Sequence, residues 1–342
     1  MSRPLPAADV ARPFAAAADV RYWTLPTGSR LAYLEIPATG EAKLASAPIV
    51  LVGGGPGEAV VSDASQARYF GQLARLGRPV YVYDQLGAGL SSRLDDPAGY
   101  TVRCHVDDLE GIRQALGADR LVLMGSSWGG SLVASYLARH PDRVAKAVST
   151  SPAPIDYAQY GAGSVSSRLP ARQRKRADGL LPGTTRFTLW LALGAVNPQA
   201  AHRMVSDREA DAFFDGYLDL VSPATVCDPA HLPGGRTRGN GLYTNIFTTR
   251  DARTTRTQAE TRRLLAGNRT PALIVTGGCN YVPWEPTRQY AEILTASTLV
   301  CLPRAGHVIH YDAPAAYLGL VTAFLRDEPL PVPAWTSAAP CR

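Results

Sequence analysis

Six short runs of apolar and β-branched residues, without polar alternation, recur along the chain. They are APIVLV (47–52), RPVYVYD (78–84), DRLVLMG (119–125), RVAKAVST (143–150), PALIVTG (271–277) and STLVCLP (297–303). Such runs are typical of strands that are buried on both faces of a parallel sheet. An earlier segment, 20–36, predicts a hairpin, because two strand-like stretches flank the turn residues Thr27, Gly28 and Ser29.

Helical periodicity occupies most of the gaps between these runs. The predicted helices span 64–77, 101–117, 128–140, 285–295 and 313–326. Strands that alternate with helices predict an α/β fold, in which a mostly parallel central sheet has helices on both faces.

The alternation stops near residue 152 and resumes near residue 271. Between these points the pattern is helical, and one predicted helix carries Asp211, Asp215 and Asp219 along its flank, which we interpret as a solvated acidic edge. An insertion of this length predicts a helical cap over the carboxyl edge of the sheet, where open α/β sheets bind ligands. The expected organisation is an N-terminal extension (1–19), a core in two parts (20–151 and 271–328), the cap (152–270) and a loosely packed, proline-rich tail (329–342).

Composition is that of an ordinary globular protein, with 46% apolar and 19% charged residues among 342, which allows a large core. No apolar run is long enough to span a membrane, and the N-terminus lacks the apolar region of a secretory signal, so we expect a cytoplasmic protein. The five cysteines are scattered and include no CxxC pair. We therefore predict reduced thiols rather than disulfides or a zinc site.

The net charge of +6 comes largely from two basic segments, 168–176 and 250–263. Neither is interleaved with aromatic residues, which argues against nucleic-acid binding. We favour a solvated basic face. The alternative is a docking surface for an acidic partner such as a carrier protein.

The strongest chemical motif is Gly125-Ser126-Ser127-Trp128-Gly129, between a predicted strand and a predicted helix. This is the G-x-S-x-G pattern of a nucleophile elbow, in which glycines give room for a strained turn that exposes the central serine. Ser127 is therefore the candidate nucleophile. The amide of Trp128, at the start of the helix, is a candidate donor to a developing oxyanion.

A glycine-rich loop, VGGGPGEA (52–59), follows the first buried strand. No lysine follows in the spacing of a phosphate-binding loop. Beside a nucleophile elbow, such a loop predicts a second oxyanion donor, which we assign to the amide of Gly55.

His307 lies just after the last predicted strand, where a base for Ser127 is expected, and imidazole has a pKa suited to that role. His310 is the competing candidate, which we interpret as a histidine on a helix surface. The remaining histidines follow no predicted sheet strand and look incidental: His105, His140, His202 and His231.

Four segments together resemble the α/β-hydrolase superfamily and, within it, the proline iminopeptidase branch. They are GGGPG, YDQLGAGLSS, GSSWGGS and AGHVIHYDAP, where that branch reads HGGPG, DQRGxGxS, GGSWGS and GHxxxxxxP. The resemblance covers about 20–150 and 270–326. It implies a sheet with a cap, a Ser–His–acid triad with Ser127 and His307 as members, and hydrolysis of an N-terminal aminoacyl amide or a related amide or ester.

The chain departs from that family pattern at several positions. Gly53 and Leu86 stand where the branch has histidine and arginine. The branch binds the free amine of its substrate with cap glutamates, and the best local match here places Asn240 where one of them would be. A strict aminopeptidase activity is therefore expected only if Glu209 or the flank of Asp211, Asp215 and Asp219 substitutes for that glutamate.

Asn280 occupies the position that the family gives to the triad acid. One interpretation is that another acid serves: Asp156, after the strand that follows the elbow helix, or less readily Glu285. A second is that Asn280 itself orients His307 through its side-chain oxygen, as the asparagine of papain-like enzymes does. A third is a site that has been retired or repurposed, as in a lyase, a cyclase or a binding protein.

We conclude from the sequence that the chain is a serine hydrolase of the α/β-hydrolase fold, which cleaves an amide or ester bond of a largely apolar small molecule. A role in secondary metabolism, similar to that of aminoacyl-amide hydrolases of macrolactam pathways, fits the altered amine site. No cofactor or metal is implied. The apolar residues expected to face the substrate are Trp190, Phe213, Phe214 and Tyr217. The alternative is a non-hydrolytic enzyme or a ligand-binding protein on the same scaffold.

Overall fold

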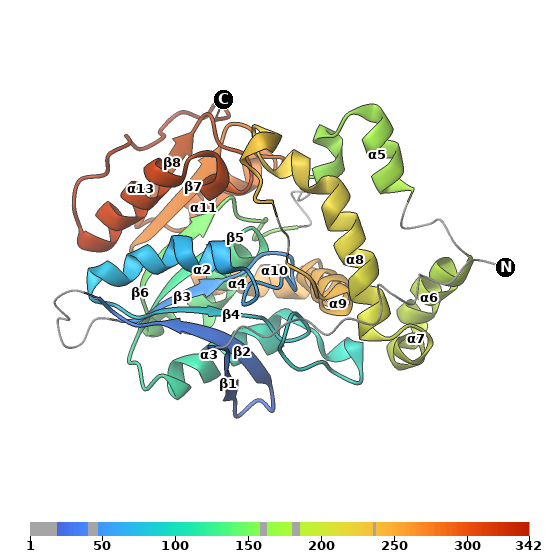
Figure 1. Cartoon of the computed structure of the whole chain (residues 1–342). Helices are drawn as coiled ribbons and strands as arrows, with labels where there is room; N and C mark the ends of the chain where they lie inside the picture. The colour runs from blue at the N-terminus through green and yellow to red at the C-terminus, as the bar shows by residue number, and fades with distance from the viewer. Residues whose placement is uncertain (1–18, 40–46, 158–162, 180–184, 235–236, 342) are drawn as a thin grey trace.

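The computed structural model describes residues 19–39, 47–157, 163–179, 185–234 and 237–341. An eight-stranded sheet lies at its centre, in the order β1-β2-β4-β3-β5-β6-β7-β8 (Figure 1). The strands are β1 (Arg21–Thr24), β2 (Arg30–Ile36), β3 (Ile49–Val52), β4 (Val80–Tyr83), β5 (Leu121–Ser126), β6 (Val144–Thr150), β7 (Ala272–Gly277) and β8 (Ser297–Leu302).

The sheet is mostly parallel, as the sequence predicts. All pairs from β4 to β8 are parallel, whereas β2 is antiparallel to both β1 and β4. Strands β1 and β2 form the hairpin that was expected around Gly28. Because the parallel strands share one direction, the loops that follow β3, β5, β7 and β8 meet at a single edge of the sheet.

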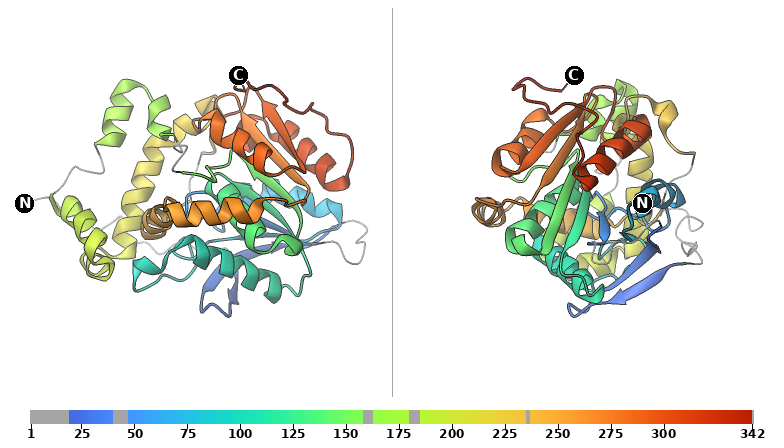
Figure 2. Two further views of the ribbon diagram at one scale, coloured as in Figure 1. Left: turned by 180° about the vertical axis from the view of Figure 1, so that it is seen from behind. Right: turned by 90° about the vertical axis from the view of Figure 1, so that its left-hand side faces the viewer.

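Helices cover both faces of the sheet (Figure 2). Alternate residues of each buried strand point to opposite sides: Val50 packs in the core that includes α3 and α4, whereas Leu51 packs in the core that includes α13. The helices and turns of this part are α2 (Ala64–Phe70), η1 (Gly71–Leu76), η2 (Pro97–Gly99), α3 (Val102–Ala115), α4 (Trp128–Arg139), η3 (Pro141–Arg143), α11 (Trp284–Ile293), α12 (Ile309–Asp312) and α13 (Pro314–Arg326).

The regular elements in the described part of the segment between β6 and β7 are all helices, joined by loops. It consists of η4 (Val165–Arg168), α5 (Ala171–Asp178), α6 (Thr185–Val196), α7 (Pro198–Met204), α8 (Asp207–Val221), η5 (Ser222–Thr225), η6 (Pro229–His231), α9 (Leu242–Ala252) and α10 (Thr255–Leu265). In Figure 1, α5 to α8 stand to one side of the sheet, whereas α10 packs against α4. Within the described ranges, no helix combines the length and apolar character needed to cross a membrane.

The prediction of reduced thiols is wrong for four of the five cysteines. Cys227 is bonded to Cys279, and Cys301 to Cys341, with Cα–Cα distances of 5.4 and 5.8 Å. The partners are 52 and 40 residues apart in the chain, and the fold brings them together. The second bond and a hydrogen bond from the Trp335 amide to the Leu299 carbonyl (2.7 Å) attach the tail to β8, although most residues of the tail are exposed.

Candidate active site

Ser127 occupies a sharp turn between β5 and α4. Its backbone has φ = 53°, an unfavourable value for a residue with a side chain, and such strain is typical of functional sites. A Cβ atom on Gly125 would overlap the backbone of Gly129, and one on Gly129 would overlap the carbonyl of Val52. The two glycines of the motif are therefore required for the turn, as expected for a nucleophile elbow.

The N-terminus of α4 lies at Ser127. Ser127 is the N-cap residue of this helix, but its side chain makes no capping hydrogen bond, so the hydroxyl stays directed elsewhere. Trp128 is the first helical residue. Its amide belongs to the group of N–H donors that a helix leaves without intrahelical partners, which suits it to bind a developing negative charge.

His307 and Asn280 lie side by side on the loops after β8 and β7. The Nδ1 atom of His307 is 2.8 Å from the Oδ1 atom of Asn280. Oδ1 also accepts from the Val282 amide (3.1 Å), and Asn280 Nδ2 donates to Thr276 Oγ1 (3.3 Å). This network fixes the orientation of the amide, so the Nδ1 atom of His307 carries the proton and Nε2 is left as the acceptor.

Burial keeps the imidazole neutral. His307 is 5% exposed, and this removal from water lowers its pKa to about 3. A carboxylate at position 280 would oppose that shift, whereas the asparagine amide carries no charge to do so. The imidazole is therefore neutral above about pH 3, with Nε2 as its acceptor.

Tyr281 contacts the other side of the imidazole. Its hydroxyl donates to His307 Nε2 at 3.3 Å, and the two rings are 4.3 Å apart. Burial raises the pKa of the phenol well above its ordinary value, and the nearby Ser127 opposes that shift. Tyr281 thus lies close to both Ser127 and His307. No sequence motif identifies Tyr281, and its place next to Asn280 is the one available signal.

The alternative acids lie elsewhere. Asp156 forms an ion pair with Arg262 at 3.3 Å, and its amide donates to Gln289. Glu285 is exposed in the first turn of α11. The interpretation in which Asp156 or Glu285 orients His307 is therefore wrong, because the Nδ1 atom is already occupied by Asn280.

The glycine-rich loop after β3 forms the wall beside Ser127. A Cβ atom placed on Gly54 would lie 3.3 Å from Ser127 Cβ and 3.1 Å from Oε2 of Glu58. The Gly54 amide donates to that carboxyl oxygen at 2.7 Å. Gly55, our candidate donor, follows with φ = 106°. Glu58 was missed because nothing in its sequence context distinguishes it from a loop charge.

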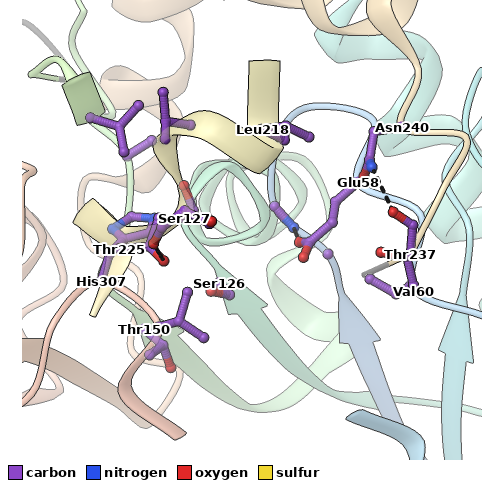
Figure 3. A pocket seen from close by; sticks show the side chains of 18 of the residues that line it. Glu58, Val60, Ser126, Ser127, Thr150, Leu218, Thr225, Thr237, Asn240 and His307 are labelled. Atoms are coloured by element: carbon purple, nitrogen blue, oxygen red, sulfur yellow. Dashed lines mark hydrogen bonds between the residues drawn. The ribbon is translucent and has the colours of Figure 1, made fainter. Parts of the chain in front are cut away.

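These groups open into one cavity of about 540 Å³ (Figure 3). Ser127, Glu58 and His307 line it from the sheet side, and Glu58 and His307 lie on opposite sides of Ser127 in this view. Helix α8 contributes apolar side chains, including Phe214 and Tyr217, as expected. The other two expected residues do not line the cavity: Phe213 stacks on Phe187, and Trp190 is buried against Tyr243.

His310 is not a helix-surface histidine. It lines the cavity, stacks on Tyr69 with a ring separation of 5.2 Å, and packs edge-on against Phe70. Burial lowers its pKa to about 4. The short helix α12 places it opposite α2, a long-range packing that local sequence could not reveal.

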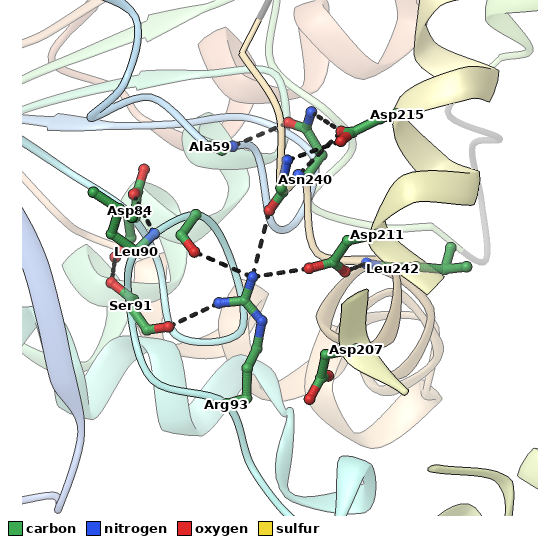
Figure 4. A network of polar contacts seen from close by, with 12 residues as sticks. Ala59, Asp84, Leu90, Ser91, Arg93, Asp207, Asp211, Asp215, Asn240 and Leu242 are labelled. Atoms are coloured by element: carbon green, nitrogen blue, oxygen red, sulfur yellow. Dashed lines mark hydrogen bonds and ion pairs between the residues drawn. The ribbon is translucent and has the colours of Figure 1, made fainter. Parts of the chain in front are cut away.

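The acidic flank of α8 is a solvated edge only at Asp219, which is exposed as expected, whereas its other two aspartates are buried (Figure 4). Asp211 and Asp215 are 3% and 5% exposed. Asp211 pairs with Arg93 (2.9 Å) and accepts from the Leu242 amide (3.0 Å). The helical pattern identified the flank but not the loop that covers it, which supplies the arginine.

Asn240 links this network to the loop that carries Glu58. Its Nδ2 atom donates to Asp215 Oδ1 (2.6 Å), and its Oδ1 atom accepts from the Ala59 amide (3.0 Å). Both ends of the amide are thus used to join α8 to the glycine-rich loop (Figure 4). Glu209, another acid of the segment, pairs with Arg186.

Known proteins with a similar sequence belong to the α/β-hydrolase fold family. Residues 47–314 match the family model described as the alpha/beta hydrolase fold. A proline iminopeptidase of Lactobacillus delbrueckii subsp. lactis is 40% identical over 130 residues, a match that covers 36% of this chain and 41% of the relative. The proline iminopeptidase of Levilactobacillus brevis is 26% identical over 295 residues, which cover 84% of this chain and 90% of the relative.

Solved structures share the fold. The crystal structure of proline iminopeptidase from Mycobacterium smegmatis superposes with a TM-score of 0.56 at 20% identity, over 90% of this chain and 98% of that one. At this level of identity the likeness extends to the fold alone.

Proposed function

We propose, from the premise that this chain belongs to the α/β-hydrolase fold family, that it is a serine hydrolase that cleaves an amide or ester bond of a small molecule. The observation that carries the proposal is the convergence of Ser127, Tyr281 and His307 at one edge of the sheet, beside the start of α4. Such a set of groups suits acyl transfer to water.

In the proposed mechanism, the oxygen of Ser127 adds to the substrate carbonyl while its proton passes through the Tyr281 hydroxyl to His307 Nε2. Tyr281 accepts one proton and gives up its own, so the phenol is unchanged by the transfer. The amide of Trp128 binds the oxyanion, with Gly55 as the candidate second donor. His307 then returns the proton to the leaving group, and water releases the acyl group by the same path.

Asn280 supports this chemistry only in part. Its oxygen holds His307 in the tautomer that leaves Nε2 free to accept a proton. It lacks the negative charge that stabilises an imidazolium, and replacing aspartate by asparagine costs a serine protease about 10⁴ in turnover. We therefore expect slow cleavage of unactivated amides and adequate rates with activated esters or thioesters.

The cavity supports a small, largely apolar substrate. Its volume of about 540 Å³ lies within the range typical of small-molecule sites, and α8 contributes an apolar wall. The similarity to proline iminopeptidases favours an aminoacyl amide or a related compound. A role in secondary metabolism is part of this proposal.

A carrier-bound substrate is a further part of the proposal. Helix α5 exposes Arg172, Lys175 and Arg176, and residues 163–165, just before this region, line the cavity. A basic surface near a cavity favours docking of an acidic carrier protein.

Labelling with a fluorophosphonate probe tests the function directly. We expect one covalent adduct on Ser127, located by mass spectrometry, and a burst of product with p-nitrophenyl esters. The variant Ser127→Ala should abolish both while keeping the melting temperature of the parent. Absence of both the adduct and the burst in the parent would refute the hydrolase proposal.

One observation favours a second candidate function. The Tyr281 hydroxyl occupies the atom of His307 that a serine nucleophile would use, so the pair could serve a lyase or cyclase as acid and base without an acyl-enzyme. For that function, Ser127→Ala would retain turnover of the true substrate, whereas His307→Ala would abolish it.

A further inference from the structure

Glu58 places a carboxyl group in the wall of the active site. Its Oε2 atom accepts a hydrogen bond from the Gly54 amide (2.7 Å), and the position of a Gly54 side chain would touch both this oxygen and Ser127. The second oxygen, Oε1, receives a long contact from Gln66 Nε2 at 3.5 Å. Glu58 is thus held beside the nucleophile, on the side away from His307 (Figure 3).

Two acidic groups act on the carboxyl group of Glu58. They are Asp63, at the start of α2, and Asp84, in the loop after β4. Both raise the pKa of Glu58, in addition to its burial, which is the main cause, and the hydrogen bonds from Gly54 and Gln66 oppose the shift only in part. The phenol of Tyr281 also faces it across the site, and is neutral. The surroundings therefore favour an uncharged carboxyl group.

The chemistry of acyl transfer also favours an uncharged carboxyl group on Glu58. Addition of Ser127 to a carbonyl creates an oxyanion next to the glycine-rich loop, and a carboxylate anion at that place would repel it. A neutral carboxyl group would instead offer an O–H donor. Enzymes do use an acid kept neutral by an apolar site as an oxyanion donor, as in ketosteroid isomerase.

We propose that Glu58 is a catalytic residue, which in its protonated form donates a hydrogen bond to the substrate carbonyl oxygen and completes the oxyanion hole. This inference rests on the proposed hydrolase function. The proton stays on Glu58 throughout: Ser127 adds to the carbonyl carbon, its proton goes to His307, and the oxyanion accepts the hydrogen bond. On collapse the bond to the leaving group breaks, and the leaving group takes the proton from His307.

The pH dependence of kcat/KM with an activated ester tests the role. A group that must be protonated is active below its pKa, so activity should fall as the pH rises through the pKa of Glu58. In Glu58→Gln the amide can still accept from Gly54 and donate to the oxyanion. We expect this variant to stay within about fivefold of the parent at acidic pH and to lose the alkaline fall. Glu58→Ala should lower kcat about 10²- to 10³-fold with little change in KM.

Asp63→Asn provides a matched variant. Asparagine keeps the cap of α2 but removes a negative charge that raises the pKa of Glu58. The alkaline fall should therefore move to lower pH, a shift that a purely structural role of Glu58 would not produce. Melting temperatures of all three variants, measured alongside, separate loss of fold from loss of function.

Two results would overturn the inference. If Glu58→Gln is as inactive as Glu58→Ala at every pH, the anionic form is the required one. If both variants keep the activity and the pH profile of the parent, Glu58 has no part in catalysis. Either result leaves the hydrolase proposal intact, provided that the parent is labelled at Ser127. Failure of that labelling would refute the hydrolase function and this inference with it.

Discussion

The side-chain oxygen of Asn280 lies 2.8 Å from the Nδ1 atom of His307, where serine hydrolases place a carboxylate. Hydrogen bonds with the Val282 amide and with Thr276 hold the Asn280 side chain in this orientation. The molecule therefore keeps the directional part of the Asp–His interaction and gives up the charge.

Restoring the charge should raise activity. In Asn280→Asp, a carboxylate beside Nδ1 would stabilise the imidazolium that forms during attack, and kcat on p-nitrophenyl esters is expected to rise by about tenfold or more. The control is Asp156→Asn, which should leave kcat within about twofold, because Asp156 pairs with Arg262 away from His307. A fall in kcat for Asn280→Asp would argue that the neutral amide is itself needed.

Removing the phenol oxygen should slow the reaction. Tyr281→Phe keeps the ring against the imidazole but removes the hydroxyl that contacts Nε2 and through which the proposed mechanism moves the proton of Ser127. We expect kcat to fall by about 10² with KM nearly constant, in the range of a general acid–base contribution. Stopped-flow acylation rates report this step directly. An increase in rate would instead identify Tyr281 as an obstacle to the serine–histidine contact.

The base should remain active in acid. Burial lowers the pKa of His307 to about 3, and the active neutral form exists above that value and is lost as the pH falls through it. The acidic limb of kcat/KM should therefore lie near pH 3 rather than near 6.5, the ordinary pKa of histidine. A profile measured from pH 3 to 8 with a pH-insensitive ester checks this. A midpoint above 6 would show that the imidazole is hydrated in solution.

The buried acid of α8 should matter for stability. Asp211→Ala leaves the Arg93 guanidinium without its carboxylate, and loss of one partner of a buried ion pair costs about 3–5 kcal/mol. Asp219→Ala, on the same helix, removes a more exposed partner of Arg238 and should cost less than about 1 kcal/mol. Urea unfolding of both variants measures the difference. Equal midpoints would contradict the burial of Asp211.

The sequence identifies the groups that stand at strand ends, because parallel strands bring their carboxyl ends to one edge. Ser127, Trp128, Asn280 and His307 could be found in this way. Glu58 and Tyr281 could not, since their roles come from hydrogen bonds across the site rather than from spacing. The same limit applies to Asp211 and to Cys227, whose partners lie far away in the chain and meet only in the folded molecule.

Asn240 joins α8 to the Ala59 amide, one residue after Glu58. If α8 moved outward to admit a substrate or release a product, the hydrogen bonds of Asn240 would have to lengthen or break. The backbone of the glycine-rich loop beside Ser127 would then be displaced as well. The position of α8 is therefore coupled to the conformation of the loop that carries Glu58.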